Sequence, residues 1–242
     1  MTEPVTLPAF AEPIERVLVV VAHPDDAEYG TSAAVATWTS AGVDVAYLLL
    51  TAGEAGMKRP PEEAGPLRAE EQQNACAAVG VKRLNVLDFP DGTLEYSLEL
   101  REAIAREIRR FRPDVVVGGA GQLDTPWGFD HADHRAAGLA TIDAVRDADN
   151  RWVFPQLLRD GLEPWGPKWL FVVASTHPTH HVAVTEDGRD RAVRSLAAHK
   201  AYLADLPWHP APVELVDGVL GGGGKASGVP RAVTFDVRKL HD

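Results

Sequence analysis

Residues 17–36, VLVVVAHPDDAEYGTSAAVA, begin as an apolar run and then break into a histidine and two adjacent aspartates. Adjacent carboxylates repel each other, and the end of a buried strand is a costly place to hold them. A positive charge at this place would offset the repulsion. His23, Asp25 and Asp26 therefore indicate a cation site that follows the first strand of the chain.

A second motif with the same residue types is His131-Ala132-Asp133-His134. One imidazole and one carboxylate from the first motif, with one imidazole from the second, make a three-ligand site. This is the ligand number of a catalytic zinc ion, which keeps its fourth position for water. A zinc-activated water, a carboxylate base and a nearby histidine together indicate hydrolysis of an amide or an ester.

The spacing alone leaves the individual roles open. One of the two adjacent aspartates can bind the metal while the other accepts a proton from the water. His131 and His134 are one helical turn apart, so one can be a ligand while the other faces the substrate. Asp133 lies between them and can orient an imidazole by accepting its N–H.

The elements that must position these motifs alternate between strand and helix. Buried β-branched runs predict strands, and longer segments ended by glycine or proline predict helices. This alternation is typical of a doubly wound α/β fold, in which ligands bind at the carboxyl ends of the strands. The predicted strands cover residues 17–22, 43–51, 83–89, 114–119, 169–175, 180–185 and 231–237, and the predicted helices cover residues 31–42, 67–80, 97–111, 131–145 and 187–206.

We therefore expect a single Rossmann-like α/β domain over residues 16–242, with a mainly parallel sheet and helices on both faces. Residues 1–15 are expected to be an N-terminal extension, and residues 176–242 a small C-terminal cap that faces the substrate. Within this cap, the glycine run from Gly221 to Gly224 lacks the Lys-Ser/Thr of a phosphate loop and predicts a mobile loop.

Composition and charge argue against several classes of partner. The chain has 242 residues, 45% of them hydrophobic, and a formal net charge of −11. This acidity argues against a nucleic acid or an anionic membrane surface as the partner.

The N-terminus has no apolar segment typical of a signal peptide, so we expect a cytoplasmic protein. The single cysteine of the chain, Cys76, excludes an intrachain disulfide framework. The excess of arginine over lysine indicates a bacterial source.

The two histidine motifs resemble those of the PIG-L (LmbE-like) zinc-dependent de-N-acetylases. That family shares AHPDD after the first strand and HPDHRAAG later, and this chain has AHPDDAEYG and HADHRAAG, with Ala132 in place of the proline. The likeness extends to TAGEAG at residues 51–56, to LRAEEQQNA at residues 67–75 and, loosely, to residues 182–200. The resemblance implies removal of an N-acetyl group from an amino-sugar-containing small molecule.

The resemblance also implies roles for individual residues. His23, Asp26 and His134 would bind one zinc ion per chain, which ferrous iron could replace, and Asp25 would be the general base. The resemblance further implies that His131, oriented by Asp133, would act as an electrostatic stabiliser or acid. Arg68 would be the arginine that binds substrate hydroxyls.

Three segments depart from the family's usual pattern. They are AVT at residues 183–185 in place of DIT, AHKAY at residues 198–202 in place of AHxSQ, and RAVTF at residues 231–235 in place of YAEAF. Because members differ in substrate there, the substrate stays open. One alternative is an amidase that cleaves a larger thiol-sugar conjugate with the same metal site. Another is a non-catalytic Rossmann-like binding protein, although residues 22–30 lack GxGxxG. Assembly into a homo-oligomer also stays open.

Several other residues have two interpretations each. Glu28 could bond a ligand histidine or favour the following helix N-terminus, and His199 could lie at the site or pack in the core. A second metal at the histidines of STHPTHH is disfavoured, because adjacent residues on a strand point to opposite faces. Tryptophans in loops could form an apolar or sugar-stacking rim. The residues concerned are His177, His180 and His181, and Trp127, Trp165 and Trp208.

Overall fold

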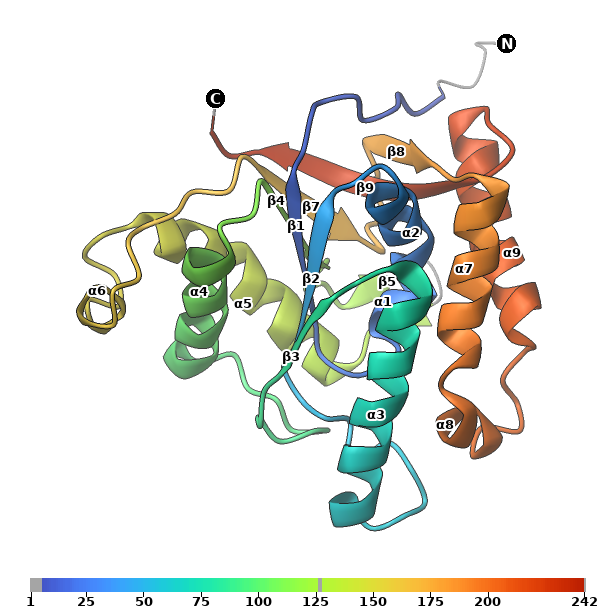
Figure 1. Cartoon of the computed structure of the whole chain (residues 1–242), viewed down its shortest axis with the longest axis horizontal. Helices are drawn as coiled ribbons and strands as arrows, with labels where there is room; N and C mark the ends of the chain where they lie inside the picture. Colours follow the sequence, from blue (N-terminus) through green and yellow to red (C-terminus); the bar gives the residue numbers. More distant parts are fainter. Residues whose placement is uncertain (1–5, 126–127, 242) are drawn as a thin grey trace.

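The computed structural model describes residues 6–125 and 128–241. Within these ranges a central sheet has the strand order β3-β2-β1-β4-β7-β9-β8 (Figure 1). The first five strands in this order run parallel, β9 pairs antiparallel with β7, and β8 pairs antiparallel with β9. The strands are β1 (Arg16–Val21), β2 (Asp44–Leu49), β3 (Arg83–Val86), β4 (Val115–Gly119), β7 (Trp169–Val173), β8 (His180–Ala183) and β9 (Ala232–Lys239), with a separate hairpin of β5 (Asp124–Thr125) and β6 (Gly128–Phe129).

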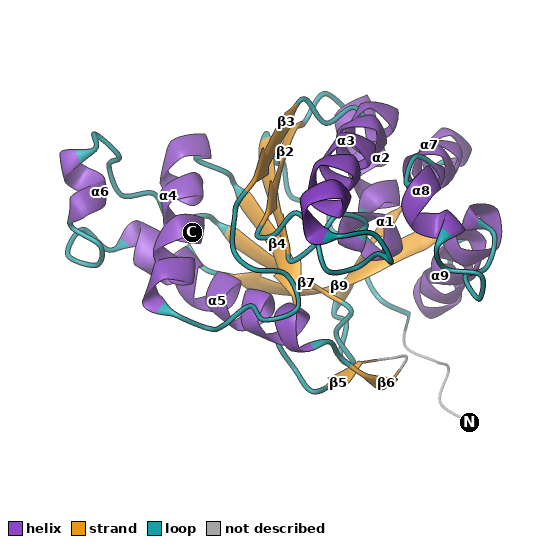
Figure 2. Cartoon of the chain, turned by 90° about the horizontal axis from the view of Figure 1, so that it is seen from below, coloured by secondary structure: helices purple, strands orange, loops and turns teal. Residues whose placement is uncertain are grey.

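Helices cover both faces of the sheet, as Figure 2 shows from below. Helices α4 and α5 pack on one face, and α1, α2, α3, α7 and α9 lie on the other side. This arrangement confirms the predicted α/β fold with a mainly parallel sheet. The helices are α1 (Asp26–Gly30), α2 (Ser32–Ser40), α3 (Pro61–Val79), α4 (Leu98–Phe111), α5 (Ala132–Asp149), α6 (Gln156–Arg159), α7 (Glu186–Ala197), α8 (Lys200–Ala204) and α9 (Pro212–Ser227).

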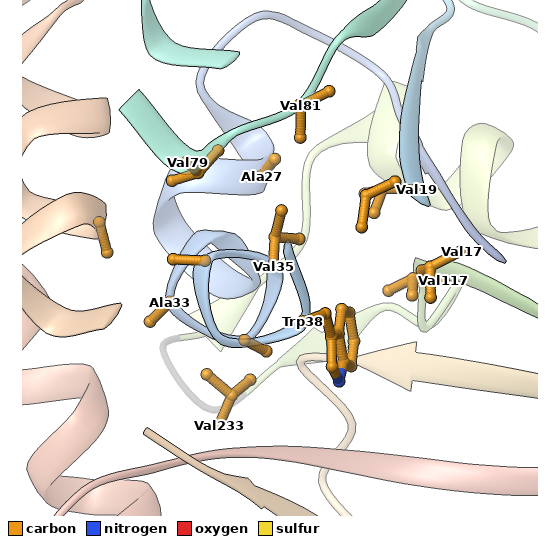
Figure 3. Close-up of a cluster of buried hydrophobic side chains, with 14 of the residues drawn as sticks. Val17, Val19, Ala27, Ala33, Val35, Trp38, Val79, Val81, Val117 and Val233 are labelled. Carbon is orange, nitrogen blue, oxygen red and sulfur yellow. The ribbon is translucent and has the colours of Figure 1, made fainter. Parts of the chain in front are cut away.

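The central strand β1 is buried on both faces. Val17 and Val19 belong to the core that contains Trp38 of α2 (Figure 3), and Leu18 and Val20 belong to the opposite core under α4 and α5. Burial on both faces explains why β1 is a continuous apolar run rather than an alternating one. Each such side chain contributes about 1.5–3 kcal/mol when fully buried. The strand is therefore a firm support for the polar turn that follows it.

The sheet has a topological switch point between β1 and β4. From β1 the chain continues outward to β2 and β3 on one side, and β4 and β7 lie on the other. β1 pairs in parallel with β4, with Val17 opposite Val115 and Val19 opposite Val117. Ligands of open α/β sheets bind outside the carboxyl ends of the strands at such a point. The two histidine motifs follow these two neighbouring strands.

The glycine run at residues 221–224 lies inside helix α9, so the predicted mobile loop is wrong. A Cβ atom on Gly223 would lie 2.1 Å from the carbonyl oxygen of Ala232, and one on Gly224 would lie 2.6 Å from that of Val229. At these two positions glycine allows the helix to approach the backbone of β9 and the turn before it.

The predicted helix over residues 187–206 is interrupted and forms α7 and α8. The break occurs at His199, whose side chain is completely buried. Carboxylate oxygens of Glu71 accept hydrogen bonds from the backbone N–H groups of Ala201 and Tyr202, at 2.5 and 3.3 Å. A tertiary contact from α3 thus satisfies the first N–H groups of α8, which a helix leaves unpaired.

Residues 6–10 of the predicted extension run along the edge strand β8. Ala9 forms a parallel bridge with His181, and the Phe10 ring packs edge-on against Trp169 and Phe171, with centroids 5.3 and 4.7 Å apart. No helix in the part of the chain that the structure describes is long and apolar enough to cross a membrane.

Candidate active site

The turn after β1 holds Asp25 in an unusual backbone conformation. Its φ of 86° lies in the left-handed region, where a residue other than glycine is uncommon and is enriched at functional sites. The backbone N–H of Asp25 donates to Gln72 Oε1 at 2.9 Å, and its carbonyl accepts from the N–H of Glu28 at 2.8 Å. The Asp26 carboxylate accepts from the N–H of His23 at 2.9 Å. These bonds fix the turn from both sides.

His23, Asp26 and His134 converge as the sequence predicts. Their prospective ligand atoms all lie within 4.8 Å of one another. Asp26 Oδ1 is 3.1 Å from His134 Nε2, and Asp26 Oδ2 is 3.5 Å from His23 Nδ1. The carboxylate and the His134 ring are partly exposed, which leaves the cluster open on one side.

Each of these two histidines presents its second ring nitrogen to another carboxylate. His23 Nε2 lies 3.0 Å from Asp91 Oδ1 and 3.1 Å from Asp133 Oδ2, and His134 Nδ1 lies 2.9 Å from Asp130 Oδ1. Carboxylates that hold the outer nitrogen of an imidazole are the usual support of a metal-ligating histidine. Two imidazoles and one carboxylate form a donor set that suits zinc or a similar first-row dication, so the residues present fit the predicted ion.

A second convergent group consists of His23, His131 and Asp133. It shares His23 with the first, so the two groups are alternatives for one ion. Asp133 already accepts from the N–H groups of Gly92 and Leu94 at 2.7 and 3.1 Å. The Asp133 carboxylate is thus committed to the backbone and to His23, which favours the group with Asp26 and His134 as the metal site.

The surplus of carboxylates shifts the protonation of the histidines. Burial by itself would lower the pKa of His23, but hydrogen bonds to Asp133, Asp26 and Asp91 raise it to about 12. Burial also opposes protonation of His134, whose pKa is nevertheless raised to about 9, chiefly by Asp26. The reciprocal effect of His134 and His23 lowers the pKa of Asp26 against the effect of its burial. This pocket therefore favours positive charge.

These shifts predict that metal binding releases protons. Both rings are protonated on both nitrogens at neutral pH in the metal-free protein, because the pKa values of His23 and His134 are raised to about 12 and about 9. Each ring must lose its second proton to become a neutral ligand. The apparent affinity for zinc should therefore rise as pH increases from 6 to 8. Titration calorimetry in buffers of different ionisation enthalpy measures the released protons. An affinity that is independent of pH would contradict the assignment of His23 and His134.

Asp25 directly precedes Asp26 of the metal cluster in the chain, and its side chain is buried. Its Oδ1 accepts from Arg68 Nη2 at 3.1 Å, whereas its buried Oδ2 has no hydrogen-bond partner among the described residues. Burial raises the pKa of Asp25 to about 7, although the positive charge of Arg68 opposes the shift and Asp26 adds to it. A carboxylate with one oxygen held and the other free is suited to accept a proton.

Arg68 reaches the site, but the structure does not present it as an open hydroxyl-binding group. The residue is 2% exposed. Its guanidinium donates to the carbonyls of Gly53 and Pro24, at 2.9 and 2.6 Å, and to Asp25. It also lies over the ring of Tyr202, 4.0 Å from the centroid. In this structure the guanidinium holds the candidate base, and its contact with substrate hydroxyls stays a prediction.

The predicted orientation of His131 by the Asp133 carboxylate is not what the structure shows. That carboxylate points to His23, and it is the backbone N–H of Asp133 that donates to His131 Nδ1, at 3.2 Å. The reason is local: His131 is the extended residue before α5, whereas Asp133 lies in the first turn with a fully buried side chain. Because Nδ1 is an acceptor, the proton of the neutral His131 ring is on Nε2.

Sequence reasoning missed three residues of this network: Asp91, Asp130 and Gln72. Asp91 lies in the turn FPDG after β3, and its N–H donates to Glu54 Oε1 at 2.9 Å. Asp130 directly precedes the second histidine motif, which was a usable signal because it is four residues before His134. Gln72 is one helical turn beyond Arg68 on α3, and only the tertiary fold shows that it contacts Asp25.

The other candidate residues lie outside the site or have structural contacts. His181 Nδ1 lies 2.9 Å from the carbonyl oxygen of Leu7, and among the described residues both potential metal groups include His23, not the histidines of STHPTHH. Trp165 donates its indole N–H to the Pro113 carbonyl. Pro113 precedes β4, so this contact lies at the amino ends of the strands, away from the site. Trp208 is 74% exposed, and Trp127 lies outside the described residues.

Comparison with known proteins agrees with this arrangement. The family model PIG-L: GlcNAc-PI de-N-acetylase matches residues 18–145, which include both histidine motifs. The chain is 30% identical over 200 residues to the diacetylchitobiose deacetylase of Thermococcus kodakarensis, a match that covers 81% of this chain and 73% of that protein.

Two solved structures show the same fold. The N,N'-diacetylchitobiose deacetylase from Pyrococcus horikoshii superposes with a TM-score of 0.83 at 23% identity, over 93% of this chain and 84% of that chain. A conserved protein from Thermus thermophilus superposes with a TM-score of 0.75 at 29% identity, over 93% of this chain and 96% of that chain. The sequence matches, the shared fold and the paired motifs together show that this chain belongs to the PIG-L family of de-N-acetylases.

Proposed function

We propose that this chain is a zinc-dependent hydrolase that removes the N-acetyl group of an amino-sugar-containing small molecule. The observation that carries the proposal is the convergence of His23, Asp26 and His134. Asp25, the residue next to Asp26 in the chain, adds a buried Oδ2 without a hydrogen-bond partner among the described residues. When bound at this cluster, a dication supplies Lewis-acid polarisation of the amide carbonyl and lowers the pKa of an attacking water.

Asp25 is the proton acceptor in this proposal. Its free Oδ2 takes a proton from the attacking water, while Arg68 holds Oδ1 and keeps the carboxylate in place. The leaving amine needs a proton to depart, and protonated Asp25 is the group that carries one. A single carboxylate thus acts first as base and then as acid.

His131 donates to the oxygen on which negative charge develops. The rings of His23 and His134 lie 5.5 Å from the His131 ring, centroid to centroid, so it borders the metal cluster without being needed in the proposed ligand set. With Nδ1 occupied by the N–H of Asp133, its Nε2–H is the free donor. A preorganised donor of this kind stabilises a tetrahedral oxyanion.

The replacement His131→Ala should keep the metal and reduce turnover about 10²- to 10³-fold, the usual cost of one oxyanion donor. Steady-state kinetics and the metal content of the purified variant test this. Near-normal turnover would show that His131 supports the fold only, and loss of the metal would place it among the ligands.

The substrate class follows from the family rather than from the geometry. A chain that is 30% identical to a diacetylchitobiose deacetylase, and that belongs to a family described as GlcNAc-PI de-N-acetylase, is proposed to act on N-acetylglucosamine derivatives. An acetate-release screen of N-acetylglucosaminides with the zinc-loaded protein tests the proposal, with Asp25→Asn as the control. Acetate and free amine should form in equal amounts with wild type only. Failure to release acetate from any N-acetylglucosamine derivative would overturn it.

A further inference from the structure

One face of helix α3 carries four buried residues that connect distant parts of the chain. Arg68, Glu71, Gln72 and Ala75 follow the spacing i, i+3, i+4 and i+7, which places them on a single side of the helix. Arg68 and Gln72 contact the turn that bears Asp25. Glu71 and the carbonyl of Ala75 contact the region of α7 and α8. This face joins the candidate base to the C-terminal third of the chain.

Glu28 lies at the centre of this junction and has no role in the chemistry described above. Its side chain is completely buried. Ser195 Oγ, from α7, donates to Glu28 Oε1 at 2.9 Å, and His199 Nε2 lies 3.4 Å from Glu28 Oε2. A buried carboxylate needs such partners, because an unpaired one is strongly destabilising. Both partners come from the segment around the break between α7 and α8.

Gln72 carries the connection from Glu28 to Asp25. Its Nε2 lies 3.4 Å from each carboxylate oxygen of Glu28, and its Oε1 accepts from the backbone N–H of Asp25 at 2.9 Å. An amide side chain has its donors and its acceptor on opposite sides, so a carboxylate at one end selects the orientation of the other. The N–H that donates to Gln72 belongs to Asp25, whose backbone has a φ of 86°. Such a conformation persists only where its surroundings enforce it.

We propose that His199 is a positioning residue for the candidate base: it fixes Glu28, which orients Gln72, which in turn holds the backbone of Asp25. This inference rests on the proposed function, in which Asp25 transfers the proton. His199 touches neither the metal ligands nor the reacting atoms in this account. Its charge also acts directly on the buried Asp25, whose pKa it lowers, whereas the positioning effect that we propose passes through Gln72.

The first test is His199→Leu against the conservative His199→Gln. The leucine removes the ring nitrogen that lies 3.4 Å from Glu28 Oε2. The resulting freedom of Asp25 should lower kcat about 10- to 100-fold with little change in KM, since small misplacements of a catalytic group have effects of this size. Zinc content should stay at the wild-type level because no ligand is changed. The glutamine keeps a donor and should restore most of kcat. If His199→Leu does not fold, Ser195→Ala removes the hydroxyl that donates to Glu28 Oε1 and is measured in the same way.

A double-mutant cycle separates positioning from general loss of stability. If His199 acts through Gln72, the variant Gln72→Met/His199→Leu should have about the same kcat as Gln72→Met alone. Multiplied losses in the double variant would overturn the proposal. His181→Leu is a matched control, because His181 is also a buried histidine but bonds to Leu7 in the N-terminal segment. It should lower the melting temperature and leave kcat unchanged.

Hydrogen exchange gives a readout that does not depend on activity. The Asp25 amide donates to Gln72 and should therefore be protected in wild type. Its exchange should accelerate in His199→Leu but not in His181→Leu. Unchanged exchange, or unchanged kcat, in a folded His199→Leu protein would overturn the positioning role. If wild type releases no acetate, the proposed function fails, while the exchange rates still decide whether His199 holds Asp25.

Discussion

Asp25→Asn should retain the bound zinc and lose about 10²- to 10⁴-fold in turnover, the usual contribution of a positioned general base. Asparagine has nearly the same shape as aspartate and tolerates the left-handed conformation that residue 25 adopts, so the turn should stay intact. The asparagine lacks a carboxylate, so the unpartnered Oδ2 of Asp25 is no longer there to accept a proton. Kinetics of acetate release together with metal analysis of the same preparation measure both properties.

The matched variant is Asp26→Asn, one residue further along the turn. Because Asp26 lies between the two histidines, at 3.5 Å from His23 Nδ1 and 3.1 Å from His134 Nε2, its substitution should weaken metal binding. If Asp25→Asn loses the metal while Asp26→Asn keeps it, the roles of ligand and base are exchanged. If Asp25→Asn keeps full turnover, another group is the base.

The second large effect is expected for His134→Ala, which should lose both metal and turnover. His134 supplies one of only three protein ligands in the proposed site, and its ring is already oriented by Asp130 at 2.9 Å. Three-ligand sites are those of catalytic zinc, and removing one ligand leaves two. The measurement is metal content by mass spectrometry after dialysis, with His131→Ala as the control that keeps its metal. Wild-type metal content in His134→Ala would instead assign the ion to the alternative group of His23, His131 and Asp133.

Much of the fold and of the metal cluster could be predicted because local patterns encode them. The apolar, β-branched run before His23 predicts a strand buried on both faces, and the second motif begins a helix after another such strand. Neighbouring parallel strands bring their carboxyl ends to one edge, which is enough to join His23 and Asp26 with His134. None of these steps needs a side-chain contact that is distant in sequence.

The parts that could not be predicted depend on tertiary contacts. Nothing in the local sequence around Arg68 shows that its guanidinium is enclosed by Gly53, Pro24 and Asp25. The carboxylate of Asp91 reaches His23 across a separation of 68 residues. This contact depends on the sheet, in which β3 and β1 run parallel on either side of β2, so that the turns after both strands lie at the same end.

The glycine run was misjudged for the same kind of reason. Gly223 and Gly224 have the composition of a flexible loop, but they serve the close approach of α9 to the backbone of residues 229–232. Composition reports conformational freedom in the unfolded chain, whereas the packed structure decides whether that freedom is used.

The most direct test of the central claim is a zinc titration of the metal-stripped protein with acetate release as the readout. We expect no release from an N-acetylglucosaminide before zinc is added, a rise in proportion to added zinc, and saturation at one equivalent per chain, with no rise in His134→Ala. Acetate release by the metal-stripped protein, or a rate in His134→Ala that follows zinc as in wild type, would contradict the account.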